Sequence, residues 1–311
     1  MVFHFSKLPL ELALEILQLA ASTGSSANDQ PRNRIYHTAT SLALVSSNVR
    51  QVVMRHLLRT VILNSQETLN LFLRTLHQQK SFSSTGSRLS LDYTRHVRHL
   101  WSSQCWEPLA DQPESHFINY RPFYDLFSRA ETLGFNFKSI HLLYDALGDV
   151  RLGYLQHWNC TRVTFGGSRL RWNALTSTNS GVAFLREITH LTIWDPVNYG
   201  LSSPSHSDGG VPSWISKIPF KLMPKLTHFA FTLVGTRGSA TTPVLVYTLP
   251  PSESSQGGGT SFLTWALSSD PIAFGSVVQL NVNQPMAGPI PDDSWELAYY
   301  RGENDIWQAS N

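Results

Sequence analysis

Four histidines are the residues whose type and spacing could carry chemistry in this chain. Histidine is the side chain best suited to act as a general base or metal ligand near neutral pH. His99, His190 and His228 each hold the third position of a short apolar pattern, and His141 holds the fifth position of another copy. These positions alternate with the apolar ones, so in a strand the imidazoles should face solvent. The pattern predicts either a histidine-lined binding face or polar residues that merely suit an exposed strand surface.

The spacings that recognised catalytic and metal sites need are missing from the sequence. His96 and His99 form only a weak ligand pair, with no H-E-x-x-H or paired C-x-x-C motif beside them. There is no G-x-S-x-G elbow and no G-x-x-x-x-G-K-[ST] loop. Cys105 and Cys160 cannot staple a chain of 311 residues and are expected to be free buried thiols. We therefore expect no catalytic residue, no cofactor and no metal; an enzyme with an unrecognised site stays an alternative.

The pattern that contains the histidines, apolar-x-x-apolar-x-apolar, recurs along the chain and predicts strands. Its copies are Phe137/Ile140/Leu142, Cys160/Val163/Phe165, Ile188/Leu191/Ile193, Leu226/Phe229/Phe231 and Val277/Leu280/Val282, with a partial copy at Val97/Leu100. It matches the strand of a leucine-rich repeat, whose last two apolar positions face the core. The starts lie 40, 23, 28, 38 and 51 residues apart, whereas a regular array keeps to roughly 20–29. The array is therefore expected to be irregular.

Helical segments are expected between these strands, which favours parallel strands joined by crossovers. The candidates are 66–78, 119–133 and 261–268, and a further strand is expected over 243–249. Segments 81–87, 200–210 and 250–259 are rich in Ser, Gly and Pro and are expected to be loops. The predicted fold class is α/β, with residues 61–311 forming an irregular leucine-rich-repeat-like solenoid of parallel strands and helices. An ordinary α/β domain with a chance pattern is the alternative.

Two further features of this region can be predicted. The side chains that flank the core positions should form one face for a protein target, with Trp101 and Arg162 as the strongest anchors because both types dominate interface energetics. The expected target-binding residues are Trp101, His141, Arg162, His190 and His228. At the other end, Asp292 to Trp307 is expected to form a helix that caps the solenoid.

The first sixty residues carry a different signal, two apolar helices separated by a polar stretch. Leu8-Pro9-Leu10-Glu11-Leu12 opens the first helix, where Pro9 suits the first turn. Its apolar residues fall on two faces, one with Leu12, Ile16 and Leu19, and one with Leu10, Leu14, Leu17 and Ala21. Since an ordinary surface helix shows one apolar stripe, this helix should be covered from both sides, by its own domain and by a partner. Complete burial in its own fold is the alternative.

This helix and Leu42-Ala43-Leu44-Val45-Ser46, which opens the second, together resemble the F-box. Divergent modules of fungal F-box proteins are the most similar, and the chain departs from the usual motif at Asn48 and Val49 and by the insertion 24–36. The resemblance implies a helical module over 1–60 that binds the Skp adaptor of a cullin complex. It also implies a substrate-recognition subunit of an SCF-type ubiquitin ligase. The matching residues are Leu8, Pro9, Leu12, Ile16, Leu44 and Val45. A free-standing protein-interaction scaffold is the alternative.

Composition agrees with a cytoplasmic or nuclear protein. Charged residues make up 15% of the chain and the net charge is +2, so nucleic acid is not an expected partner. Glu11 and Glu15 interrupt the only apolar run near the start, which argues against a secretion signal. No stretch is long and apolar enough to predict a membrane span.

Overall fold

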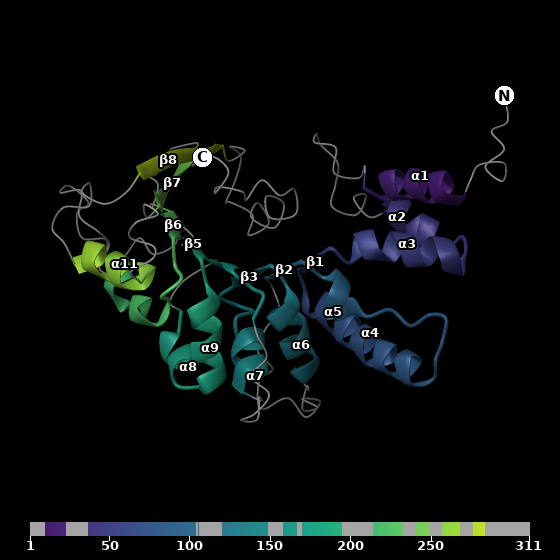
Figure 1. Ribbon diagram of the computed structural model, residues 1–311, viewed down its shortest axis with the longest axis horizontal. Coiled ribbons are helices and arrows are strands. Elements are labelled where there is room, and N and C mark those ends of the chain that lie inside the picture. Colours follow the sequence, from purple (N-terminus) through teal and green to yellow (C-terminus); the bar gives the residue numbers. More distant parts are fainter. Residues whose placement is uncertain are drawn as a thin grey trace. The chain divides into compact units, whose positions relative to one another are not determined.

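The computed structural model describes residues 10–22, 37–103, 105, 120–148, 158–166, 170–194, 214–232, 241–248, 257–267 and 276–283. The chain is an α/β protein that divides into two compact units. Unit 1 comprises Met1–Val61 and Asn70–His99, and unit 2 comprises Ile62–Leu69 and Leu100–Asn311. The helices and strands of both units are drawn in Figure 1.

Unit 1 begins with three helices that pack against one another: α1 (Leu10–Ser22), α2 (His37–Ala43) and α3 (Ser47–Leu57). Small and branched side chains let them approach, since Ala13, Ala39 and Val53 are all buried. The side chain of Ser46 caps α3 by accepting a hydrogen bond from the Val49 N–H at 3.3 Å. Helices were predicted for this part of the chain, and they are present.

Two further helices follow, α4 (Gln66–Ser84) and α5 (Tyr93–His96). The helix predicted over 66–78 is confirmed but longer, so the loop predicted over 81–87 was wrong for its first four residues. Asp92 caps α5 by accepting the Thr94 N–H at 3.1 Å. Within unit 1 the ring of Phe72 on α4 lies 6.1 Å from the ring of Tyr93.

The strands form one sheet in sequential order, β1-β2-β3-β4-β5-β6-β7-β8. They are β1 (Thr60–Leu63), β2 (His99–Ser102), β3 (Thr132–Asn136), β4 (Arg162–Gly166), β5 (His190–Trp194), β6 (His228–Thr232), β7 (Thr241–Thr248) and β8 (Ser276–Asn283). The first six run parallel, and β7 and β8 are antiparallel to their neighbours. The parallel sheet and the extra strand near 243–249 are therefore confirmed.

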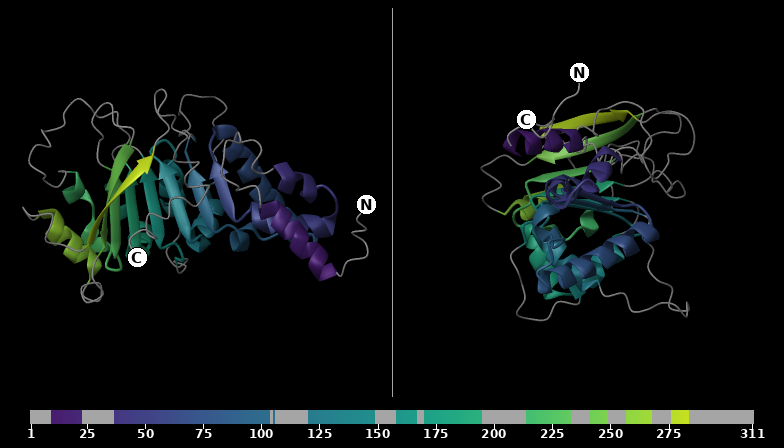
Figure 2. Two further views of the ribbon diagram at one scale, coloured as in Figure 1. Left: turned by 90° about the horizontal axis from the view of Figure 1, so that it is seen from above. Right: turned by 90° about the vertical axis from the view of Figure 1, so that its right-hand side faces the viewer.

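Helices connect the parallel strands and lie on one side of β3 to β6 (Figures 1 and 2). They are α6 (Arg121–Arg129), α7 (His141–Gly148), α8 (Trp172–Thr176) and α9 (Asn179–Glu187), with the 3-10 turns η5 (Ile215–Lys217) and η6 (Phe220–Leu222). A further helix, α11 (Gly258–Leu267), lies between the antiparallel strands β7 and β8 in the sequence. The predicted helices 119–133 and 261–268 correspond to α6 and α11. The predicted range 119–133 extends too far at its C-terminal end, because α6 ends at Arg129 and β3 begins at Thr132.

The repeat pattern holds for most strands, but two of its copies were placed wrongly. Phe137/Ile140/Leu142 falls on a turn and on α7, whereas the true strand is Ala130-x-x-Leu133-x-Phe135. Val277/Leu280/Val282 lies on β8, which is antiparallel and so belongs to a hairpin. The pattern also fits Leu58-x-x-Val61-x-Leu63 on β1. The corrected starts are residues 58, 97, 130, 160, 188 and 226, which are 39, 33, 30, 28 and 38 residues apart.

A recurring backbone hydrogen-bond pattern supports the corrected positions. The N–H groups of Thr189 and His190 both donate to the carbonyl of Thr161, at 2.8 and 3.0 Å. The same double donation occurs at three other steps of the sheet. The N–H groups of residues 227 and 228 donate to the Thr189 carbonyl, those of 161 and 162 to the Glu131 carbonyl, and those of 98 and 99 to the Arg59 carbonyl. The second residue of one repeat thus accepts from the second and third residues of the next. Parallel strands are held in register by this step.

Aromatic side chains fill the core between the sheet and the helices of unit 2. Phe127 on α6 lies 5.3 Å edge-on from Phe135 of β3, and Trp158 lies 5.1 Å from Phe184 of α9. Farther along, Phe220 of η6 packs 5.4 Å from Phe229 of β6. The apolar positions of the repeat therefore face the helices, as the pattern predicts.

Several predicted features lie outside the described residues: Leu8 and Pro9, the insertion 24–36, the loop 200–210, most of the loop 250–259, and the capping helix from Asp292 to Trp307. Among the helices that the structure does describe, none has the length and apolarity to cross a membrane.

Candidate interaction sites

The first candidate site is a set of exposed apolar side chains in unit 1, here named the apolar set. On α1, Leu12, Ile16 and Leu19 are 48%, 41% and 57% exposed. Their spacing of four and three residues places them on one face of the helix. Ala13, on the other side, is buried against its own unit. The face with Leu12, Ile16 and Leu19 is thus exposed to solvent, whereas Leu14 and Leu17 of the other predicted apolar face are half-buried.

The turn between α2 and α3 completes the apolar set. Leu44 and Val45 are 81% and 68% exposed. The turn that presents them is closed by backbone hydrogen bonds from Leu44 N–H to the Ser41 carbonyl (3.2 Å) and from Val45 N–H to the Leu42 carbonyl (3.1 Å). Four of the six residues predicted to bind the adaptor are therefore exposed large apolar side chains, and Leu8 and Pro9 lie outside the described residues.

The second candidate site is a row of polar side chains on the sheet of unit 2. Arg162 pairs with His190, and His190 pairs with His228, in the registers of three adjacent parallel strands. Arg162 is exposed and the two imidazoles are half-buried. The prediction that these three residues share one face of the sheet is confirmed. The imidazole rings of His190 and His228 stack, with centroids 4.1 Å apart and an 8° angle between the ring planes.

Each stacked ring is hydrogen-bonded to the threonine that precedes it. The Thr189 hydroxyl lies 3.1 Å from the Thr161 carbonyl, to which it can donate, and 2.7 Å from Nδ1 of His190. Thr227 repeats the arrangement toward the Thr189 carbonyl and His228. Burial, the second ring and Arg162 lower the pKa of His190 to about 3, and burial and Arg162 lower that of His228. At neutral pH this row therefore carries the charge of Arg162 beside two neutral imidazoles.

Two of the predicted target-binding residues do not lie on this face as expected. His141 starts α7 and is buried, with its ring 6.0 Å from Tyr120, because the strand assigned to it lies seven residues earlier. Trp101 is on β2 but only 1% exposed. Its indole reaches across the sheet to Gly166, where an added Cβ would stand 3.5 Å from the ring. Trp101 is therefore a core residue and cannot anchor a target.

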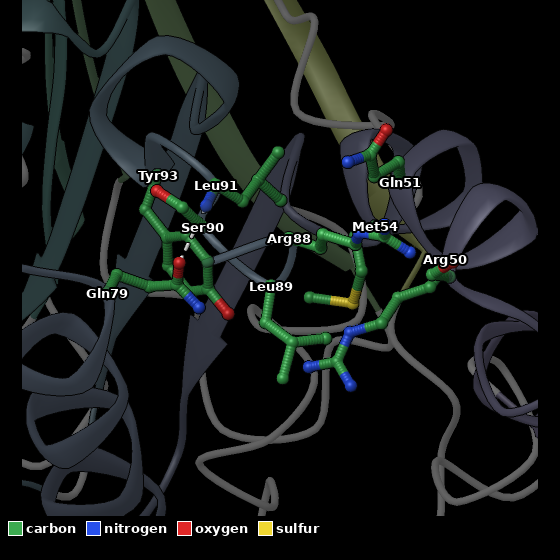
Figure 3. Close-up of a pocket in the computed structure, with 10 residues that line it drawn as sticks. Arg50, Gln51, Met54, Gln79, Arg88, Leu89, Ser90, Leu91 and Tyr93 are labelled. Atoms are coloured by element: carbon green, nitrogen blue, oxygen red, sulfur yellow. Dashed lines mark hydrogen bonds between the residues drawn. The ribbon is translucent and has the colours of Figure 1, made fainter. Parts of the chain in front are cut away.

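A third feature, which the sequence did not predict, is a groove inside unit 1 (Figure 3). One wall is α3, with Arg50 and Met54, and the other is the segment before α5, with Arg88 and Leu89. The Gln79 side chain fixes this segment by accepting the Leu91 N–H at 2.7 Å. No short motif signals the groove, because its walls come from residues about forty positions apart.

The two units carry opposite formal charges, which the small net charge of the whole chain does not reveal. Unit 1 contains eleven Lys and Arg against four Asp and Glu, a formal charge of +7. Unit 2 contains thirteen against eighteen, a formal charge of −5, and the two values add to the +2 of the chain. A strong charge of one sign steers oppositely charged partners. Unit 1 thus attracts acidic surfaces although the whole chain is nearly neutral.

The thiols and acids of the described residues do not suggest catalysis. Cys105 and Cys160 are buried thiols outside any disulfide, as predicted. Burial raises the pKa of Cys160 to about 12, so its thiol is protonated and a poor nucleophile at neutral pH. Within the same described residues, no three His, Cys, Asp or Glu side chains gather as a metal site requires.

Comparison with protein-family models, with curated proteins and with solved structures finds no match to this chain.

Proposed function

We propose that this chain is the substrate-recognition subunit of an SCF-type cullin ubiquitin ligase. Unit 1 would bind the Skp adaptor through the apolar set, and unit 2 would hold the protein target. The observation that carries the proposal is the exposure of Leu12, Ile16, Leu44 and Val45, the residues on which the F-box resemblance rests.

Solvent exposure of these side chains has a free-energy cost that a partner removes. Full burial of one Leu, Ile or Val side chain contributes ~1.5–3 kcal/mol. The apolar set offers five such side chains on α1 and on the turn before α3. Contiguous exposed apolar patches mark protein contacts, and the proposal takes the apolar set to act as such a patch when the adaptor binds.

The parallel sheet of unit 2 supports the second half of the proposal. We interpret its repeated strand and helix units as irregular leucine-rich-repeat-like units, with the row Arg162, His190 and His228 as part of the target face. Arg162 would supply the charged contact, and the neutral imidazoles would supply flat, half-buried contact area. Such a subunit accelerates ubiquitin transfer by holding a target near the reacting enzyme, with no catalytic group of its own.

Binding to purified Skp adaptor tests the proposal. Calorimetry on the full chain should give a Kd in the micromolar range or below. Replacing Leu44 and Val45 together by Asp should raise that Kd by roughly 30-fold or more, since burying an unpaired carboxylate costs at least ~2 kcal/mol. Leu71→Asp is the matched control, because Leu71 is also exposed in unit 1 but on α4. Failure of the wild-type chain to bind, or equal losses in both variants, would contradict the proposal.

The alternative is a protein-interaction scaffold with no role in ubiquitin transfer. It is favoured by Asn48 and Val49, which stand where the F-box usually has a basic residue and a Trp. In that case a partner other than the adaptor covers the apolar set. The adaptor-binding experiment separates the two functions.

A further inference from the structure

The groove of unit 1 combines two cations with an apolar floor. Arg50 comes from α3 and Arg88 from the segment before α5. In the view of Figure 3, the thioether of Met54 lies between the two guanidinium groups. Leu89, which is 41% exposed, extends the apolar surface beside it. The groove therefore presents positive charge, apolar surface and positive charge in succession.

Among the described residues, those that line this groove include no carboxylate. The acidic residues of unit 1 that the structure describes are Glu11, Glu15 and Asp92. The first two are on α1 and outside the groove lining, and Asp92 binds Arg95 through a 3.1 Å ion pair. Among the described residues of unit 1, the charges of Arg50 and Arg88 are therefore not compensated by a carboxylate that lines the groove.

The floor of the groove restricts what the cations can hold. The Tyr93 side chain is buried and its ring lies against Phe72, so it offers no exposed aromatic face on which a base could stack. Arg50 lines the same groove as Tyr93. Burial raises the pKa of Tyr93, and the positive charge of Arg50 opposes that rise. The exposed apolar surface comes from Met54 and Leu89 and suits an aliphatic side chain. These features favour a peptide over a nucleic acid.

We propose that this groove binds an acidic peptide segment of a partner protein. Two carboxylates, separated along the peptide, pair with Arg50 and Arg88, and an apolar side chain between them packs on Met54 and Leu89. Guanidinium and carboxylate groups form strong charge-assisted hydrogen bonds, often two at a time. The net charge of +7 on unit 1 steers such a segment toward it. The site is separate from the apolar set, none of whose residues line the groove.

A fluorescein-labelled peptide with the core Glu-Leu-Glu, flanked by Gly and Ser, is a suitable probe for fluorescence anisotropy with the full chain. The double variant Arg50→Gln/Arg88→Gln should raise the Kd of this peptide about tenfold or more. Arg74→Gln/Lys80→Gln is the matched control: it removes the same charge from exposed positions of α4 outside the groove. The control should change the Kd by less than about threefold, since it alters only the long-range field. Circular dichroism should show that both variants fold.

Four results would overturn the proposal. One is no binding of the peptide by the wild-type chain at 100 µM, a limit of roughly −5.5 kcal/mol. Another is an equal loss of peptide affinity in both double variants, which would show that the peptide responds to the overall positive charge of unit 1 and not to the groove. A peptide with Gln in place of Glu that binds as tightly would remove the role of charge. Tighter binding of a phosphoserine peptide or of single-stranded DNA, lost in the groove variant, would assign the arginines to phosphate.

Discussion

The two units of this protein treat apolar side chains in opposite ways. Among the described residues, seven of the eight exposed large apolar side chains are in unit 1, and the exception is Phe137. The largest fully buried side chains, all of them Phe or Trp, are in unit 2. Unit 1 is also cationic and unit 2 anionic. Unit 1 therefore exposes apolar surface and positive charge, whereas unit 2 buries its large aromatic side chains in a core.

The largest effect should come from the aromatic core of unit 2. Phe229 is fully buried, with its ring 5.4 Å from Phe220, 5.5 Å from Phe231 and 6.0 Å from Phe262. Phe229→Ala should lower the free energy of unfolding by ~3–5 kcal/mol, because it leaves a cavity that the rigid sheet cannot close. Leu44→Ala in unit 1 should change it by less than ~0.5 kcal/mol. Urea unfolding followed by circular dichroism measures both, and similar losses would break the comparison.

A smaller effect is expected where two helices of unit 2 approach closely. Gly181 is in the first turn of α9, and a Cβ there would stand 2.1 Å from the backbone carbonyl of Leu175 on α8. Gly181→Ala should therefore cost ~1–3 kcal/mol by overpacking, although Ala is normally the better helix former. Ala183, on the same helix, gives a matched control as Ala183→Gly, which should cost only about 1 kcal/mol. A Gly181→Ala protein as stable as the wild type would show that α8 and α9 are less closely packed than described.

The last effect depends on pH and concerns the stacked imidazoles. The pKa of His190 is about 3 in the fold, against an ordinary value of 6.5. Between these values the unfolded chain binds a proton that the folded chain does not, so stability is full above pH 6.5 and falls as the pH drops toward 3. His190→Gln removes this dependence, and the difference in melting temperature between pH 7.5 and pH 4.5 should shrink. An unchanged difference would show that His190 is protonated in the fold.

Sequence patterns predicted the strands of unit 2 correctly where apolar residues for the core alternated with polar residues for the exposed face. The starts at 160, 188 and 226 were correct because their apolar residues alternate with Arg162, His190 and His228. The copy at Phe137 was wrong because the turn before α7 and the start of α7 show the same apolar spacing, with Phe137 and Ile140 in the turn and Leu142 on the helix. Ala130 was overlooked as a first position, since a small residue gives a weak apolar signal, although its side chain is fully buried.

The candidate sites differ in how far the sequence reveals them. Leu12, Ile16 and Leu19 can be placed on one face from helical spacing alone, and the structure exposes that face. The groove could not be predicted, because Arg50 and Arg88 are brought together only by the fold. The charge of unit 1 was hidden for a similar reason: the unit is made of two separate segments of the chain.

The central claim is that unit 1 binds the Skp adaptor through the apolar set. Hydrogen exchange of the full chain, followed by mass spectrometry with and without a saturating amount of the purified adaptor, tests it most directly. We expect slower amide exchange in α1 and in the turn and first residues of α3, around 10–22 and 41–50, with β4 to β6 unchanged. Unchanged exchange in both segments of unit 1, or protection confined to the strands of unit 2, would contradict the claim.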